Sequence, residues 1–173
     1  MDEEDDLRIR RVKEEELPEL VQVYKSAYHQ MVKYAYTSER KIRNYLRWLY
    51  EGDPGGFWIA EKKGRPVGFV CLHSEWEDWK WGSTGELHEL VVHKDFQGQG
   101  IGKKLLNKAL EYVREKGCKS VSLWVGEDNW LARSWYLKLG FQEKGNWGEW
   151  IRMKKDLWVP VIKEVDKNKG EKL

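Results

Sequence analysis

The chain has 173 residues, of which 40% are hydrophobic and 35% charged, so we expect one globular domain with one packed core. Its longest apolar stretches fall short of the ~18 residues of a membrane-spanning helix, and its acidic start does not resemble a signal peptide. The net charge of +2 provides no strong positive field, which argues against nucleic acid as a partner.

The two cysteines, Cys71 and Cys118, lie outside any CxxC motif or Cys/His cluster. We therefore expect no disulfide framework, no metal site, no membrane association and a reducing, cytoplasmic location. The many Lys and Glu residues are typical of heat-adapted organisms, which gives a weak indication of a thermophilic source.

Apolar periodicity and turn residues predict a series of alternating strands and helices. A first strand at 7–12 is followed by a helix at 17–31 and a second helix that Ser38 caps and Gly52 ends. The later elements are a hairpin (57–60 and 67–72), a polar and aromatic loop (74–85), a strand (86–92), a helix (101–113), a strand (120–125), a helix (131–139) and a final hairpin (141–154).

This order, β-α-α-β-β-β-α-β-α-β-β, predicts an α/β fold with a mixed, mostly antiparallel central sheet. Strands 86–92 and 120–125 flank a helix and should form a parallel β-α-β unit. We expect a single domain over residues 7–155, an acidic extension over 1–6, and a C-terminal segment over 156–173 that ends in a charged, mobile tail.

The segment Gln97-Gly98-Gln99-Gly100-Ile101-Gly102 lies between a predicted strand and an amphipathic helix. A glycine-rich turn at a helix N-terminus directs free backbone N–H groups toward an anion, although such a turn can also be purely structural. The dinucleotide fingerprint fails because Lys103 stands where its last glycine belongs, and the nucleotide P-loop fails because Lys104 replaces the required Ser or Thr.

The spacing Gln97-x-x-Gly100-x-Gly102 resembles the pyrophosphate-binding loop of the GNAT superfamily of acetyl-CoA-dependent N-acetyltransferases. The preceding segment, 90–96, is similar to the strand and turn that lead into that loop. A second signature follows at the expected separation: Asn129, Ala132, Tyr136, Gly140 and Phe141. The motifs cover about residues 85–144.

The resemblance implies acetyl-CoA as the co-substrate, held where two parallel strands part. It implies cofactor contacts from Leu90, Val91, Val92, Gln97, Gly98, Gln99, Gly100, Ile101, Gly102, Asn129 and Tyr136. The backbone N–H of Val91 or Val92 would polarise the thioester carbonyl. Asn129 also suits the N-cap of the helix that follows it, and the two roles are compatible.

Tyr136 corresponds to the family tyrosine that protonates the departing CoA thiolate, and its alternative role is to pack in the core. Strand alternation places Glu86 and His88 on one face, where GNAT subfamilies carry a catalytic Glu or His, so this pair is the expected base. His88 has a reference pKa of ~6.5. Glu89 is the reserve candidate, because a β-bulge would upset the alternation.

Eight of the eleven tryptophans fall into three groups. Trp48, Trp58 and Trp124 are expected in the core. Trp76, Trp79 and Trp81 alternate with acidic residues in the loop before strand 86–92, which suits a cationic amine or, equally, a loop folded onto the sheet. Trp147 and Trp150, in the final hairpin, should flank the cleft that receives this amine.

These features favour an N-acetyltransferase that transfers an acetyl group from acetyl-CoA to a primary amine by direct attack in a ternary complex. The amine acceptor stays open between a small amine such as an arylalkylamine, a polyamine and a protein amino group (an N-terminus or a lysine side chain), and the oligomeric state, a homodimer included, also stays open. The alternative is an acyl-CoA-binding sensor or regulatory module without turnover. A nucleic-acid-binding domain is a further rival, which the near-neutral charge disfavours.

Overall fold

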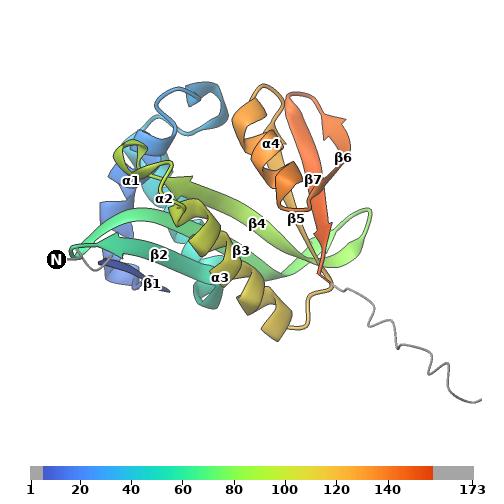
Figure 1. Ribbon diagram of the computed structural model, residues 1–173, viewed down its shortest axis with the longest axis horizontal. Coiled ribbons are helices and arrows are strands. Elements are labelled where there is room, and N and C mark those ends of the chain that lie inside the picture. Colours follow the sequence, from blue (N-terminus) through green and yellow to red (C-terminus); the bar gives the residue numbers. More distant parts are fainter. Residues whose placement is uncertain (1–5, 158–173) are drawn as a thin grey trace, which may run out of the picture.

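Seven strands pair into one sheet in the order β1-β2-β3-β4-β5-β7-β6, and the computed structural model describes residues 6–157 of the chain (Figure 1). The strands are β1 (Leu7–Arg11), β2 (Phe57–Lys62), β3 (Arg65–Asp78), β4 (Gly82–Val92), β5 (Ser120–Gly126), β6 (Gln142–Trp147) and β7 (Trp150–Asp156). Most of the expected acidic extension and of the expected C-terminal tail lies outside the described residues.

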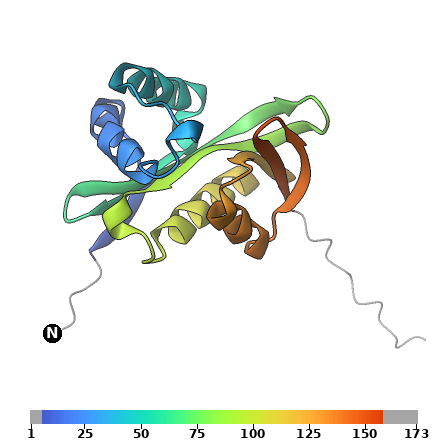
Figure 2. The same cartoon turned by 90° about the horizontal axis from the view of Figure 1, so that it is seen from above.

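The α-helices are α1 (Leu20–Ala27), α2 (Glu39–Gly52), α3 (Ile101–Glu115) and α4 (Trp130–Lys138). Helices α1 and α2 cover one face of the sheet, and α3 and α4 lie on the other (Figure 2). Ser38 caps α2 by accepting a hydrogen bond from the Lys41 backbone N–H at 3.2 Å, as the sequence predicts. Among residues 6–157, no helix combines the length and apolarity needed to cross a membrane.

The pair β4–β5 is parallel, and every other pairing recorded in the sheet is antiparallel. Helix α3 connects the two parallel strands and packs the apolar face expected of it onto the sheet. The predicted fold class is therefore confirmed: a mixed, mostly antiparallel sheet with one parallel β-α-β unit.

The loop expected at 74–85 is wrong, because these residues form the ends of β3 and β4 around a short turn. Trp76 pairs with Thr84 and Glu77 pairs with Ser83 across this hairpin. Acidic side chains alternate here with aromatic ones, and this is the pattern of a strand with one polar face. The Asp78 carboxylate accepts from the backbone N–H of Lys80 at 2.8 Å and closes the turn.

A β-bulge interrupts the β3–β4 pairing at His88. Cys71 pairs with Glu89 and the next residue, Leu72, pairs with Leu87, so that His88 is the extra residue of β4. The bulge shifts the alternation by one position, because two residues of one strand oppose one of the other. As a result Glu89 faces the same cavity as Glu86 and His88 instead of the opposite side of the sheet.

Two apolar clusters fill the two faces of the sheet. Trp58 is half-buried and packs against the cluster beneath α3. The expectation that Trp48 and Trp124 belong to the core is wrong, since they are 46% and 42% exposed. Both lie beside polar groups: Trp48 contacts the His88 ring, and Trp124 stacks under the Arg152 guanidinium.

Candidate active site

Strands β4 and β5 are paired only over Gly85–Leu87 and then diverge (Figure 1). From Glu89 to Val92, β4 remains paired with β3 on one side, but within residues 6–157 no strand pairs with its other side. This leaves backbone groups of Leu90 and Val92 along an open strand edge, because those of Val91 point toward Phe69 of β3. An extended ligand can add to such an edge as a further strand would.

The glycine turn lies at the end of the same strand. Gly98 and Gly100 have φ values of +78° and +79°, which favour glycine, and a Cβ at either position would meet no atom within 4 Å. The Gln97 side chain donates to the Val92 carbonyl oxygen at 2.9 Å and ties the turn back to β4. Gly100 is the N-cap of α3 and supplies no side-chain cap, so the turn is open toward a ligand.

Beside the diverging strands lies a cavity of about 560 Å³. Its walls come from the segment between α1 and α2, from β4, and from the β6–β7 hairpin. It is lined by Tyr24, Tyr28, Lys33, Tyr34, Ala35, Tyr36, Tyr45, Glu86, Leu87, His88, Glu89, Trp124, Trp147 and Trp150. The expectation that Trp147 and Trp150 flank the cleft holds, whereas Trp76, Trp79 and Trp81 lie outside the set that lines it.

Glu89 is 7% exposed and lines this cavity. The Tyr28 hydroxyl donates to Oε1 at 2.5 Å, and the Tyr45 hydroxyl donates to Oε2 at 3.2 Å. Burial raises the pKa of Glu89 to about 7, although the two tyrosine hydroxyls stabilise the charged form and oppose that rise. A carboxyl with this pKa exchanges protons near neutral pH, as a general base must.

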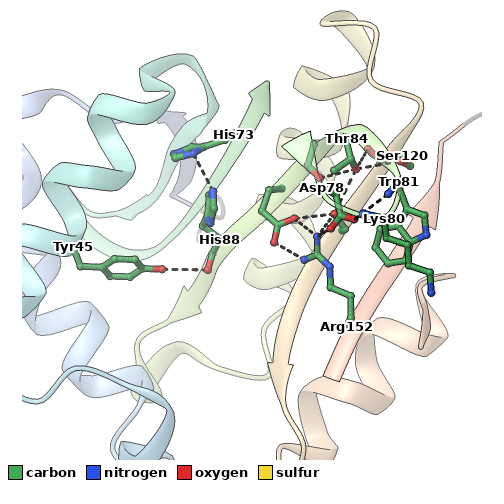
Figure 3. A network of polar contacts seen from close by, with 12 residues as sticks. Tyr45, His73, Asp78, Lys80, Trp81, Thr84, His88, Ser120 and Arg152 are labelled. Atoms are coloured by element: carbon green, nitrogen blue, oxygen red, sulfur yellow. Dashed lines mark hydrogen bonds and ion pairs between the residues drawn. The ribbon is translucent and has the colours of Figure 1, made fainter. Parts of the chain in front are cut away.

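His88 is paired with His73 at 3.0 Å, between Nε2 and Nδ1 respectively (Figure 3). His73 Nε2 lies 3.0 Å from the Leu49 carbonyl oxygen, which only accepts, so His73 carries its proton on Nε2. In this tautomer Nδ1 of His73 accepts from His88 Nε2–H. Burial and the neighbouring His73 lower the pKa of His88 to about 3, so His88 is a weaker base than its reference pKa implies.

Glu86 is bound on both oxygens by the Arg152 guanidinium, at 2.6 and 2.9 Å. Arg152 also contacts Asp78 at 2.7 Å, and the Ser122 hydroxyl donates to Glu86 at 2.8 Å. Burial raises the pKa of Glu86, and the contact with Arg152 opposes this rise. The expected Glu86–His88 pair does not form as a hydrogen-bonded unit: the two side chains share the cavity but bind different partners.

Tyr136 lies in α4, 9% exposed, with its ring against Trp135 and Phe141. Burial, and next the negative charge of Glu89, raise the pKa of the Tyr136 hydroxyl well above its usual range. Tyr136 therefore stays protonated and available as a donor. Asn129 caps α4, accepting from the Ala132 backbone N–H at 3.2 Å, as expected for one of its two roles.

Sequence reasoning missed three residues that shape this region: Tyr28, Tyr45 and Arg152. The two tyrosines fit the apolar faces of their helices, and only their hydroxyl contacts to β4 reveal another role. The sequence does contain an indication for Arg152. A charged residue between Ile151 and Met153 in a strand needs a buried partner when its face of the sheet is covered.

A parted parallel strand pair, an open glycine turn at a helix N-terminus and an adjoining cavity with a buried carboxyl are features that suit an extended anionic ligand beside a second ligand in an α/β protein. The family model described as "Acetyltransferase (GNAT) family" matches residues 17–141. The chain belongs to this family of acyltransferases.

Relatives support the assignment. An uncharacterized N-acetyltransferase of Methanocaldococcus jannaschii is 40% identical over 148 residues, which cover 85% of this chain and 66% of the relative, just under two thirds of its length. An uncharacterized N-acetyltransferase of Archaeoglobus fulgidus is 42% identical over 131 residues, covering 75% of this chain and 89% of the relative.

Solved structures share the fold. A crystal structure from Pyrococcus horikoshii has a TM-score of 0.80 at 35% identity and covers 88% of this chain and 99% of its own. The PaiA N-acetyltransferase of Thermoplasma acidophilum, solved in complex with coenzyme A, has a TM-score of 0.69 at 24% identity and covers 87% of this chain and 98% of its own. At that identity the second likeness bears on the fold alone.

Proposed function

We propose that this protein transfers the acetyl group of acetyl-CoA to a primary amine, with both substrates bound together. Glu89 is the general base in this proposal, and Tyr136 is the general acid. The observation that carries it is the position of Glu89: a buried carboxyl with a pKa of about 7, beside the point where β4 parts from β5.

Acetyl-CoA would bind along the open strand edge and the glycine turn. The pantetheine arm would pair with the backbone of Leu90–Val92, and the pyrophosphate would accept from the N–H groups of 98–102 at the N-terminus of α3. Lys103 and Lys104 in the first helical turn add positive charge near this anion. Gln97 holds the turn to the strand, and Gln99, Ile101 and Asn129 stay in the proposed contact set.

The amine enters from the aromatic cavity and attacks the thioester carbonyl, whose oxygen is polarised by the backbone N–H of Val92, since that of Val91 points toward β3. As the C–N bond forms, the amine proton passes to Glu89. The C–S bond then breaks, and the departing sulfur takes a proton from the Tyr136 hydroxyl. The proton balance closes when Glu89 releases its proton to solvent and Tyr136 regains one.

The structure favours Glu89 over the Glu86–His88 pair for the base. Glu86 is held by Arg152 on both oxygens, and the low pKa of His88 limits its strength as a base. These two residues act in the proposal as part of the cavity wall.

Thiol release from acetyl-CoA in the presence of an amine panel tests the proposal. The wild type should release CoA only when an amine is present, and Glu89→Gln should bind acetyl-CoA with little turnover. Tight acetyl-CoA binding with no transfer to any amine would instead favour a sensor of acyl-CoA.

A further inference from the structure

The acceptor cavity is lined mainly by aromatic side chains. Eight of its fourteen lining residues are Tyr or Trp, contributed by α1, the α1–α2 connection, α2, β5 and the β6–β7 hairpin. A volume of about 560 Å³ falls within the ~300–1,000 Å³ usual for small-molecule sites. Aromatic walls of this kind favour a flat ring by stacking and apolar contact.

The charges in the cavity are already matched, with one exception. Lys33 lies 2.6 Å from the Asp128 carboxylate and 3.7 Å from that of Glu149, and Glu86 is paired with Arg152. Among the charged residues that line the cavity, this leaves the Glu89 carboxylate, whose contacts are with neutral tyrosine hydroxyls. A single carboxylate without a counter-charge can balance the charge of one ammonium group. A polyamine would leave its remaining ammonium groups against aromatic surface without a counter-charge.

The two walls of the cavity touch each other. The Tyr34 ring, before α2, lies 5.2 Å from the Trp150 ring of the hairpin in an edge-to-face arrangement. The Tyr34 hydroxyl also accepts from the Asp128 backbone N–H at 3.2 Å. A polypeptide running between these walls would have to displace the Tyr34–Trp150 contact, whereas a small molecule can bind beneath it.

From these three features we infer that the acceptor is a small aromatic monoamine: a primary amine on a short chain that ends in a ring, with no second charged group. The amino group would lie toward Glu89, and the ring would lie between Tyr34, Trp124 and Trp150. This inference rests on the proposed function and adds the chemical class of its acceptor.

Steady-state acetylation of four probes tests the inference: tryptamine, hexylamine, spermidine and an unmodified tetrapeptide. Tryptamine should have a kcat/KM roughly tenfold or more above hexylamine, which has a similar amino group but no ring, because a well-packed ring contributes over 1 kcal/mol. Spermidine and the tetrapeptide should be poorer still.

Variants show whether the cavity produces this preference. Trp150→Ala should raise the KM for tryptamine roughly tenfold and raise that for hexylamine by a clearly smaller factor, because the ring of tryptamine loses a stacking partner. Trp147→Ala is the second variant, since this side chain is 75% exposed and its loss should not impair folding. Trp79→Ala, at a residue 85% exposed outside the cavity, is the matched control and should leave both amines unchanged.

The outcomes separate the inference from the proposed function. A preference for spermidine, hexylamine or the tetrapeptide overturns the inference and leaves the acetyl transfer standing. Equal increases in the KM values for tryptamine and hexylamine in Trp150→Ala and Trp147→Ala would also overturn it. No acetylation of any of the four probes by a protein that binds acetyl-CoA contradicts the proposed function itself.

Discussion

The Tyr28 hydroxyl lies 2.5 Å from Oε1 of Glu89 and joins α1 to the bulged part of β4. Tyr45 of α2 makes the corresponding contact to Oε2 at 3.2 Å. The two carboxylate oxygens have four acceptor positions between them, and the two hydroxyls and the Leu90 backbone N–H use three, so that one remains for a proton from another source. The two helices thus fix the carboxyl in place and leave it able to take up a proton.

Replacing Glu89 with Gln should lower kcat/KM roughly a hundredfold or more, since the amide keeps the shape of the side chain but cannot accept the amine proton. In the wild type, Glu89 ionises as the pH rises through about 7. Log kcat/KM should therefore rise with pH and its slope should fall by one unit near pH 7. Glu89→Gln should lack this break.

His88→Gln is the control for the base. The low pKa of His88 keeps it neutral across the assay range, so this variant should retain the break near pH 7. If the break disappears in His88→Gln and survives in Glu89→Gln, then His88 is the base and the assignment of Glu89 fails.

Glu89 should also make the fold less stable as the pH rises. Its pKa is raised in the native protein, from 4.5 to about 7, so the native state binds this proton more tightly than the unfolded chain does. The stability that this group contributes is therefore fully present below pH 4.5, and it is lost as the pH rises from 4.5 through about 7. Denaturant melts should show Glu89→Gln gaining up to about 3 kcal/mol over the wild type at pH 8. A variant that gains nothing at pH 8 would show that this carboxyl has an ordinary pKa.

Tyr136→Phe should lower kcat roughly a hundredfold and leave acetyl-CoA affinity nearly unchanged, because the ring packing survives and only the proton donor is lost. Rapid-mixing kinetics would measure the chemical step apart from product release. An unchanged rate of C–S cleavage would assign Tyr136 to the core alone.

Arg152 should be important mainly for stability. It is 5% exposed and pairs with the buried carboxylates of Glu86 and Asp78, which would be left without a counter-charge in Arg152→Met. We expect a loss of about 3–5 kcal/mol in the free energy of unfolding. Arg43→Ala, which removes an exposed pair with Glu39, should change little. If Arg152→Met lowers the free energy of unfolding no more than Arg43→Ala does, the stabilising role of Arg152 is contradicted.

The order of elements could be predicted because each leaves a local pattern. The apolar face of α3, the Ser38 cap and the glycine turn are all set by residues close in sequence. Asn129 as a cap follows for the same reason.

The choice of base could not be predicted in this way. It depends on the bulge at His88, which arises from the register between β3 and β4, and on hydroxyls that α1 and α2 bring to Glu89 from 61 and 44 residues away. The partner of Glu86 is similarly distant, since Arg152 reaches it from 66 residues away across the sheet. The strand pattern also predicts Trp124 in the core, because the sequence does not reveal that this side chain packs against the distant Arg152.

Calorimetric titration of acetyl-CoA into the wild type, Gly100→Trp and Gly117→Trp tests the cofactor site most directly. Gly117 ends α3 with a φ of +82° and open space around it, so it matches the strain at Gly100 (φ +79°) far from the turn. We expect binding by the wild type and Gly117→Trp, and none by Gly100→Trp. Equal binding by all three proteins would contradict the assignment of the glycine turn to the pyrophosphate, and no binding by the folded wild type would contradict acetyl-CoA as the co-substrate.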